Sequence, residues 1–284
     1  MATAGRLIDT SVFAGASAAY SLRIPEGSPY NGPLIRVRRT SDNAEQDINA
    51  GPADGNGNRW IDQAALLAFC GASDGRVATW YDRSGNGRNA TQGTGSAQPR
   101  IVLNGVLDTE GGKPCLVFSG TQWLVTPTIL SRTTYPFAFV NCVYRNTTIN
   151  SGNQALWGGD GGTWPRFQLL NFASASTISW GTSDGAAAAQ QTALMANTNR
   201  NIYSYNSQIP GGSQVFINGA SGVAFTESGN GMPTALTIGA IAPGGSYQLL
   251  GSVSEFIYAF GALTNATRQA LERSQGAAFG ITVA

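Results

Sequence analysis

The fold of this chain is decided by residues 81–92, which read YDRSGNGRNATQ. This polar stretch follows an apolar run over residues 77–81, so the pattern predicts a strand that ends in consecutive tight turns. Acidic and hydroxyl side chains in it can accept hydrogen bonds from nearby backbone amides, and its glycines and asparagine can adopt positive φ angles. The residues expected to do so are Asp82, Ser84, Gly85, Asn86 and Gly87.

The rest of the chain repeats this alternation of short β-rich runs and turns. Its 284 residues include 37 glycines and only 12% are charged, which suits a many-stranded protein better than a helical one. Turn signals recur at intervals of about ten residues, the spacing typical of a β-sandwich. The pair Asn218-Gly219 is also a strong hairpin signal. The expected strands cover residues 77–81, 115–118, 137–144, 167–172, 202–205, 214–217, 235–238 and 251–258.

Two short helices interrupt this pattern. Asp62 can cap a helix over residues 62–70, which has a broad apolar face. Thr264 can cap a second helix over residues 264–275, which closes at Gly276. We therefore expect an all-β fold with one helix in the first third of the chain and one near the C-terminus.

Residues 30–42, YNGPLIRVRRTSD, together with residues 81–92, resemble the opening of the arabinofuranosidase-B-like catalytic domain. The Asn218-Gly219 hairpin and the terminal helix resemble concanavalin-A-like, or laminin-G-like, sandwiches. The resemblance implies a jelly-roll sandwich of two antiparallel sheets, with residues 19–284 as one domain and residues 1–18 as an N-terminal arm or first strand. In bacteriophages this module recurs in tail and other surface proteins, usually without a demonstrated activity.

The composition limits the chemistry that the chain could carry. Histidine is absent, which excludes Ser-His and Cys-His nucleophilic sites and any histidine-bound zinc. Cys70, Cys115 and Cys142 are isolated in apolar segments, so we expect buried free thiols. Loops at Asp54 and Asp82 begin like calcium loops but lack the glutamate at the twelfth position, which favours Asx turns. We expect neither a metal nor a cofactor.

Charge and hydropathy argue against two classes of partner. The chain has 17 basic and 16 acidic residues, without the basic excess that phosphate neutralisation requires. The cluster of Arg36, Arg38 and Arg39 therefore favours a solvated strand edge over nucleic-acid contact. The first residues lack the apolar core of a signal peptide, and no apolar run approaches transmembrane length. We expect no nucleic-acid binding, no membrane insertion and maturation in a reducing cytoplasm.

Glycoside hydrolysis is one function that the resemblance implies. Retaining hydrolysis uses two carboxyl groups about 5–5.5 Å apart. The enzymes that the chain resembles place their glutamate nucleophile just after two adjacent, mutually bonded cysteines, and this chain has no adjacent cysteines. Of the acids after residue 120, Glu255 falls on an expected core strand and Glu272 on the terminal helix. A retaining arabinofuranosidase-like mechanism, the alternative function, would therefore depend on Asp160, Asp184 or Glu227.

The main prediction is carbohydrate binding without catalysis. Sandwiches of this type present sugars to loops or to a concave face, where aromatic rings lie beside polar groups. The segment between residues 157 and 180 gathers such side chains. The candidate contacts are Trp157, Asp160, Trp164, Arg166, Asn171 and Trp180. The competing interpretation is that Trp157 and Trp180 fill the core.

The resemblance and composition together predict a bacteriophage virion surface protein, either a tail or fibre adhesin or a capsid decoration protein. Unpaired cysteines, low charge and the missing export signal fit assembly in the host cytoplasm. The expected partners are other virion proteins and a host-surface glycan, in a homo-oligomeric assembly.

Overall fold

The computed structural model describes residues 16–127, 137–148, 153–159, 166–172, 177–183, 191–195, 197–208, 211–227, 235–244, 247–261 and 263–284. This part of the chain is mostly strand, with two α-helices and one 3-10 turn. The strands are β1 (Ala18–Ser21), β2 (Arg23–Ile24), β3 (Ile35–Arg39), β4 (Glu45–Ile48), β5 (Ala50–Ala53), β6 (Arg59–Ile61), β7 (Gly75–Trp80), β8 (Ala90–Thr91), β9 (Arg100–Leu103), β10 (Val106–Leu107), β11 (Thr109–Glu110), β12 (Lys113–Pro114), β13 (Leu116–Ser119), β14 (Leu124–Val125), β15 (Phe137–Asn146), β16 (Gln154–Gly158), β17 (Arg166–Phe172), β18 (Thr177–Ser183), β19 (Gln191–Met195), β20 (Asn201–Gln208), β21 (Gly211–Ile217), β22 (Ala220–Glu227), β23 (Thr237–Ile238) and β24 (Leu250–Phe260). The helices are α2 (Gln63–Cys70), η1 (Gly95–Ala97) and α3 (Asn265–Phe279).

Within the described residues, 19 strands join one antiparallel sheet whose central strand is β24. Strand β24 pairs with β1, β13 and β15. On one side the sheet continues from β15 through β20 and β21 to β22. On the other side β13 leads through β9, β7, β8, β14 and β23 to β16, and then through β17 and β18 to β19.

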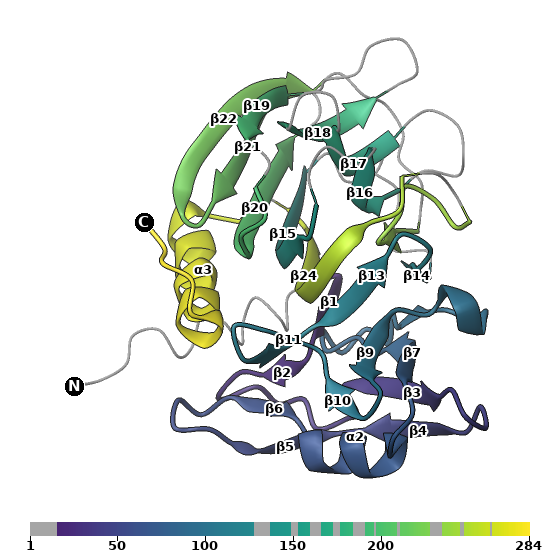
Figure 1. Cartoon of the computed structure of the whole chain (residues 1–284). Helices are drawn as coiled ribbons and strands as arrows, with labels where there is room; N and C mark the ends of the chain where they lie inside the picture. The colour runs from purple at the N-terminus through teal and green to yellow at the C-terminus, as the bar shows by residue number, and fades with distance from the viewer. Residues whose placement is uncertain are drawn as a thin grey trace.

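This sheet curls back on itself, so that its two ends face each other as the layers of a sandwich (Figure 1). Strand β22 contacts β18 and β19 from the opposite end of the sheet. Inside, Trp157 of β16 packs edge-on against Phe256 of β24 with ring centroids 5.8 Å apart. The predicted all-β sandwich is therefore confirmed, with both layers belonging to one continuous sheet instead of two separate ones.

The first third of the chain forms the lower part of the molecule in Figure 1. There β3, β4, β7 and β9 lie together, and α2 contacts β4 and β10. Strands β2, β5 and β6 form a separate three-stranded sheet beside them. Tyr20 of β1 and Trp80 of β7 join this part to the sandwich core, since their ring centroids lie 5.7 Å apart and both side chains are fully buried.

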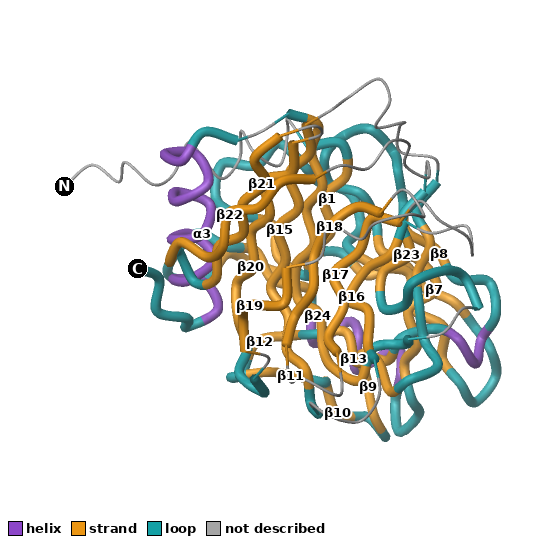
Figure 2. Tube along the Cα trace, turned by 90° about the horizontal axis from the view of Figure 1, so that it is seen from above, coloured by secondary structure: helices purple, strands orange, loops and turns teal. Residues whose placement is uncertain are grey.

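Both helices begin at the predicted caps. The side chain of Asp62 accepts a hydrogen bond from the Ala65 backbone amide, and that of Thr264 accepts one from Thr267. Helix α3 continues past Gly276, the predicted end, to Phe279. Gly276 lies inside the helix, where it is in close contact with Ile281 of the chain that follows. A Cβ atom at Gly276 would lie 2.6 Å from the Ile281 carbonyl oxygen. In Figure 2, α3 covers the outer side of the sheet next to β20 and β22, and it contacts β20 directly.

Strand β24 does not alternate between buried and exposed residues, as a strand with one solvated face would. Every residue from 251 to 259 is buried. The reason is that both faces are covered: Phe256 faces the sandwich interior, whereas Ile257 packs with Leu271 of α3.

Other local predictions also hold. Asn218 and Gly219 have φ angles of 50° and 83° in the hairpin between β21 and β22, as an Asn-Gly turn requires. Cys70, Cys115 and Cys142 are buried free thiols. In the described part of the chain, neither helix is long and apolar enough to cross a membrane.

Candidate functional site

The segment predicted to bind sugar forms part of one sandwich layer. Strands β16, β17 and β18 are neighbours, and Trp180 of β18 lies opposite Leu169 of β17. Arg166 is the first residue of β17, and Asn171 pairs with Ile178. Asp160 and Trp164 lie outside the described residues. The backbone thus brings Arg166, Asn171 and Trp180 onto adjacent strands, and their role in binding stays a prediction.

Trp157 has a different place from the other candidates. Its side chain is only 1% exposed, and its ring packs against Phe256 across the sandwich. The adjacent Gly158 lies against the neighbouring loop so closely that a Cβ atom would be 2.0 Å from the Ile241 carbonyl oxygen. Trp157 is therefore a core residue, the interpretation that the sequence left open, and it offers no ring face to a ligand at the surface.

Two of the acidic residues after residue 120 form ion pairs with arginines. Glu255 accepts hydrogen bonds from the Arg23 guanidinium at 2.9 Å and from the Ser21 hydroxyl at 2.7 Å, in a fully buried position. Glu272 is paired with Arg268 one helical turn away and is also buried. Glu227 ends β22, and Asp160 and Asp184 lie outside the described residues. Glu255 and Glu272 are thus buried ion-pair partners, and Asp160, Asp184 and Glu227 remain the candidate carboxyl groups that the sequence identified.

Tyr247 is a residue that the sequence did not single out. Its φ angle is 64°, an uncommon value for a bulky side chain, and 37% of its surface is exposed. Its carbonyl oxygen accepts a hydrogen bond from the Ala155 amide of β16 at 2.6 Å. Strained backbone of this kind is concentrated at functional sites, and the Tyr247 backbone lies beside β16, the strand that leads into the predicted sugar-binding segment. A tyrosine in a glycine-rich loop carries no sequence signal for such strain.

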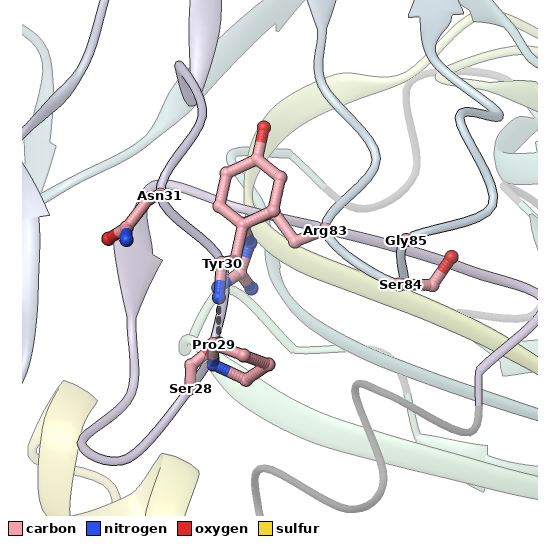
Figure 3. A pocket seen from close by; sticks show the side chains of 7 residues that line it. All are labelled: Ser28, Pro29, Tyr30, Asn31, Arg83, Ser84 and Gly85. Carbon is pink, nitrogen blue, oxygen red and sulfur yellow. Dashed lines mark hydrogen bonds between the residues drawn. The ribbon is translucent and has the colours of Figure 1, made fainter.

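The two motifs that carry the family resemblance meet at a cavity of about 270 Å³. Residues 28–31, in the loop between β2 and β3, line one side, and residues 83–85, in the turn after β7, line the other (Figure 3). Sequence analysis identified each motif from its residues. It did not predict that the two motifs face each other across a cavity.

The first loop is held by hydrogen bonds of Tyr30 and Arg59. The Tyr30 hydroxyl donates to the Pro33 carbonyl at 2.6 Å, which folds the ring over Gly32. The guanidinium of Arg59, on β6, donates to the Tyr30 carbonyl at 2.9 Å and to Asn31 Oδ1 at 3.1 Å. Burial raises the pKa of Tyr30, and the nearby charge of Arg83 opposes that shift.

The second loop is organised by Asp82, as the sequence predicts. One carboxylate oxygen accepts from the backbone amides of Ala19 and Ser84, and the other accepts from the Ser84 hydroxyl and the Arg88 amide, all within 2.9 Å. Because an ionised carboxylate has about four acceptor positions, Asp82 is saturated by these donors. The loop is therefore an Asx turn tied to β1, and it holds the Arg83 backbone against Ala19.

The glycines of this turn behave as predicted, but the asparagine does not. Gly85 and Gly87 have φ angles of 89° and 68°. Asn86 is not among the residues with positive φ; its side-chain amide instead donates to the Ala16 carbonyl at 2.9 Å. Asn86 thus fastens the turn to the chain before β1.

Beside the cavity, Asp47 forms an exposed polar cluster. It accepts paired hydrogen bonds from Arg36 at 2.7 and 3.0 Å, and a third from the Tyr81 hydroxyl at 2.7 Å. The bond to Arg36 lowers the pKa of Asp47. Partial burial, followed by the bond to Asp47, raises the pKa of Tyr81 to about 12. The charge of Asp47 is therefore balanced within this cluster.

Comparison with known proteins supports the family resemblance in part. The family described as alpha-L-arabinofuranosidase B, catalytic, matches residues 10–111, a little over a third of the chain. This range contains both loops of the cavity but not residues 157–180. A search of curated proteins gave no match.

Solved structures extend the likeness to the whole sandwich. A GH54 α-L-arabinofuranosidase soaked with a cyclic sulfate inhibitor is similar over 95% of this chain, with a TM-score of 0.70 and 14% identity. An arabinofuranosidase complexed with arabinofuranosyl-α-1,2-xylobiose gives a TM-score of 0.65 at 14% identity. The binding domain of botulinum neurotoxin serotype D matches 69% of the chain and 49% of its own, with a TM-score of 0.50 and 14% identity.

These likenesses establish the fold alone, because the identities are low. The chain spans 65% of the length of the two arabinofuranosidases. The same sandwich serves an enzyme in one case and a binding domain in another, so the activity has to be argued from the site.

Proposed function

We propose that this chain recognises carbohydrate and that α-L-arabinofuranosyl groups are the first ligand class to test. The observation that carries this proposal is the likeness over 95% of the chain to an arabinofuranosidase complexed with an arabinofuranosyl-xylobiose. The proposed site is the layer of β16, β17 and β18, with Trp164, Arg166, Asn171 and Trp180 as contacts. Tyr247, exposed beside β16, is added to them.

Hydrolysis of arabinofuranosides is the second candidate. It is favoured by the family match to an arabinofuranosidase B catalytic domain and by the enzymes among the similar structures. With Glu255 and Glu272 occupied by buried arginines, the two catalytic carboxyl groups would come from Asp160, Asp184 and Glu227. The comparisons support this activity more directly than they support a bacteriophage setting.

Attachment to a virion, assembly in the host cytoplasm and homo-oligomerisation remain proposals from the sequence. The names of the similar structures do not mention a bacteriophage. The loss of the adjacent cysteines is the sequence feature that favours a non-catalytic role on such a surface.

Binding and hydrolysis are tested with different probes. Binding is measured by calorimetry with arabinan oligosaccharides, using Trp164→Ala and the control Trp60→Ala, a half-buried tryptophan on β6 of the separate three-stranded sheet. The proposal expects binding by the wild type and by the control, and at least about tenfold weaker binding by Trp164→Ala, the scale of one lost stacking contact. No binding of arabinan by the wild type contradicts it.

Hydrolysis is measured with 4-nitrophenyl α-L-arabinofuranoside. Release of nitrophenol that disappears in Asp160→Asn, Asp184→Asn or Glu227→Gln, and persists in Glu45→Gln, supports a glycosidase. Glu45 is a suitable control because it is an exposed glutamate on β4. Binding without any release identifies a lectin-like domain.

A further inference from the structure

Five strands from the first half of the chain, β4, β3, β7, β8 and β14, are successive neighbours in the sheet. Their pairing aligns one residue of each strand in a single row, and residues directly opposite each other lie on the same face. The members of this row are Asp47, Arg36, Thr79, Thr91 and Val125, and all are exposed or half-buried. Their chain neighbours are at most 1% exposed, namely Ile48, Ile35, Trp80, Ala90 and Leu124. These strands therefore have one face in the core and one solvated face, called the outer face below.

Trp123 lies at one end of this outer face, two residues before Val125. It is half-buried, whereas the next residue, Leu124, is fully buried. The Gln92 side chain donates to the Trp123 carbonyl at 3.2 Å, so the chain at Gly93 runs beside this tryptophan. A Cβ atom added at Gly93 would meet no other residue within 4 Å. The space beside Trp123 on this side is therefore open to a ligand.

A second aromatic ring, that of Tyr81, lies at the other end of the outer face. Its hydroxyl donates to Asp47 Oδ1 at 2.7 Å. Tyr81 directly follows β7, whereas Asp47 is on β4, and β3 lies between these two strands. Because neighbouring strands are about 4.8 Å apart, the Tyr81 side chain reaches Asp47 only by lying across β3. Its ring is half-buried, so one ring face is directed at the sheet and the other at solvent.

The charged groups of the outer face are matched by neighbours of opposite sign. The matched neighbours are Arg36 with Asp47, Arg38 with Glu45, and Arg76 with Asp74. Between the two aromatic rings, Thr79 and Thr91 lie opposite each other, and each hydroxyl can both donate and accept a hydrogen bond. The outer face therefore favours a neutral ligand that carries hydroxyl groups of its own.

The two rings are too far apart for a single sugar. Val125 of β14 and Thr79 of β7 both lie opposite Thr91 of β8, so β7 and β14 run parallel. Trp123 comes two residues before Val125, and Tyr81 comes two residues after Thr79. With about 4.8 Å between strands and about 3.4 Å per residue, the two aromatic Cα atoms lie roughly 16 Å apart. The outer face is therefore long enough for several sugars in a chain, with an aromatic ring at each end.

We propose that the outer face between Trp123 and Tyr81 is a binding surface for a neutral glycan chain. The aromatic rings stack on sugars at the two ends, and the hydroxyls of Thr79 and Thr91 bind the sugars between them. This inference goes beyond the proposed function, because it adds a surface for a polymer to the site on β16–β18.

The two surfaces belong to one sheet but are separated by the chain that follows β23. On β23, Thr237 continues the row after Val125, and it is only 3% exposed. Its partner on β16, Gly158, lies against the Ile241 carbonyl oxygen, which a Cβ atom would approach to 2.0 Å. The chain at Ile241 therefore forms a border between the outer face and the β16–β18 layer.

The test is calorimetric titration of the whole chain with linear arabinan, linear mannan and polygalacturonate. We expect at least one of the two neutral polymers to bind. Added sodium chloride should leave that affinity unchanged, because the outer face presents no unmatched charge to the ligand. Failure of both neutral polymers overturns the proposal, as does binding of polygalacturonate alone.

A substitution at Gly93 locates the binding. Gly93→Gln places a neutral side chain in the open space beside Trp123, and we expect it to weaken polymer binding at least about tenfold, the scale of one lost stacking contact. Gly55→Gln is the matched control, since Gly55 is also exposed, has no positive φ angle, and has no other residue within 4 Å of an added Cβ atom. Unchanged affinity in a folded Gly93→Gln protein overturns the assignment.

A second substitution removes the aromatic ring itself. We expect Trp123→Ala to weaken polymer binding at least about tenfold and Trp60→Ala, a half-buried tryptophan on β6, to leave it unchanged. The thermal midpoint of each variant shows whether it is folded. If Trp123→Ala does not fold, Gly93→Gln decides alone.

Arabinan binding by Trp164→Ala separates this inference from the proposed function. Weaker binding in both Gly93→Gln and Trp164→Ala supports both surfaces. Weaker binding in Trp164→Ala alone overturns this inference and leaves the proposed function intact. Weaker binding in Gly93→Gln alone supports this inference and contradicts the site proposed on β16–β18.

Discussion

The guanidinium Nε of Arg23 lies 2.9 Å from a carboxylate oxygen of Glu255, and both side chains are almost completely buried. The Ser21 hydroxyl and the Gln275 amide also donate to this carboxylate, at 2.7 and 3.0 Å. Arg23 in turn donates to Asn58 at 2.7 Å. The pair thus joins the N-terminal strands to β24 and to α3, and it links the family-matched third of the chain to the sandwich.

Neutralising Glu255 should destabilise the fold strongly. Glu255→Gln leaves a buried guanidinium without its counter-charge, and breaking a buried pair in this way costs about 3–5 kcal/mol. The measurement is the free energy of unfolding in urea. Asp47→Asn serves as the control, because the Arg36–Asp47 pair is roughly 40% exposed and should contribute within about 1 kcal/mol. Equal losses in both variants would contradict the structural role of the buried pair.

Removing the carboxylate of Asp82 should disorganise the turn that forms one wall of the cavity. Asp82→Asn replaces one acceptor oxygen with an amide, so two of four donors lose their partner, at about 1–3 kcal/mol for each buried group. Ser84→Ala removes the hydroxyl bond to Asp82 and the two weaker bonds that the hydroxyl accepts from the exposed Asn86, and it should cost only about 1 kcal/mol. Urea unfolding of both variants checks this order. A smaller loss for Asp82→Asn than for Ser84→Ala contradicts it.

The fold was largely predictable because local signals and tertiary contacts agree. The caps at Asp62 and Thr264 and the Asn218-Gly219 hairpin act over a few residues, so their side chains carry the information themselves. The length of α3 was not predictable, since Gly276 reads as a helix end and is instead required by contact with Ile281. Ile281 lies after the helix and reaches Gly276 only because the chain turns back at the end of α3. The local sequence around Gly276 does not show this contact.

The candidate site was less predictable than the fold. A tryptophan between glycine-rich loops has the same local sequence whether it faces solvent or the core, and Trp157 is buried because β24 places Phe256 against it. The cavity at Tyr30 and Arg83 depends on two loops more than 50 positions apart in the sequence. Each loop is recognisable on its own, but their contact follows from the pairing of β3 with β7.

Tyr247 should be replaceable without loss of stability, although it is aromatic. Asparagine adopts positive φ angles more readily than tyrosine, so Tyr247→Asn relieves strain of about 1 kcal/mol that offsets the lost ring contacts. We expect the thermal midpoint to stay within a few degrees of the wild type. Tyr81→Asn, at a position without positive φ, loses the bond to Asp47 and should lower the midpoint. If Tyr247 contacts sugar, Tyr247→Asn also weakens arabinan binding.

The last prediction concerns alkaline pH and the buried thiol of Cys115. Burial, with the negative charges of Glu110 and Asp108, raises the pKa of this thiol to about 12. In the unfolded chain the thiol ionises near its ordinary value of about 8.5, so below that pH its contribution to stability is fully present. Between about pH 9 and 12 the unfolded state releases a proton that the folded state retains. Stability therefore falls with rising pH by up to about 1.4 kcal/mol per pH unit for this group.

Cys115→Ala isolates that contribution, because other buried groups with raised pKa values, such as Cys142 and Tyr144, are common to both proteins. Urea unfolding of wild type and variant at pH 7.5, 9.0, 9.75 and 10.5 gives two curves of unfolding free energy. We expect a constant difference between them up to about pH 8.5, set by the lost packing of the sulfur. Above that pH the wild-type curve should fall more steeply and the difference should shrink. Parallel curves up to pH 10.5 mean that the Cys115 thiol ionises as readily in the folded protein as in the unfolded chain, which its burial at 1% exposure argues against.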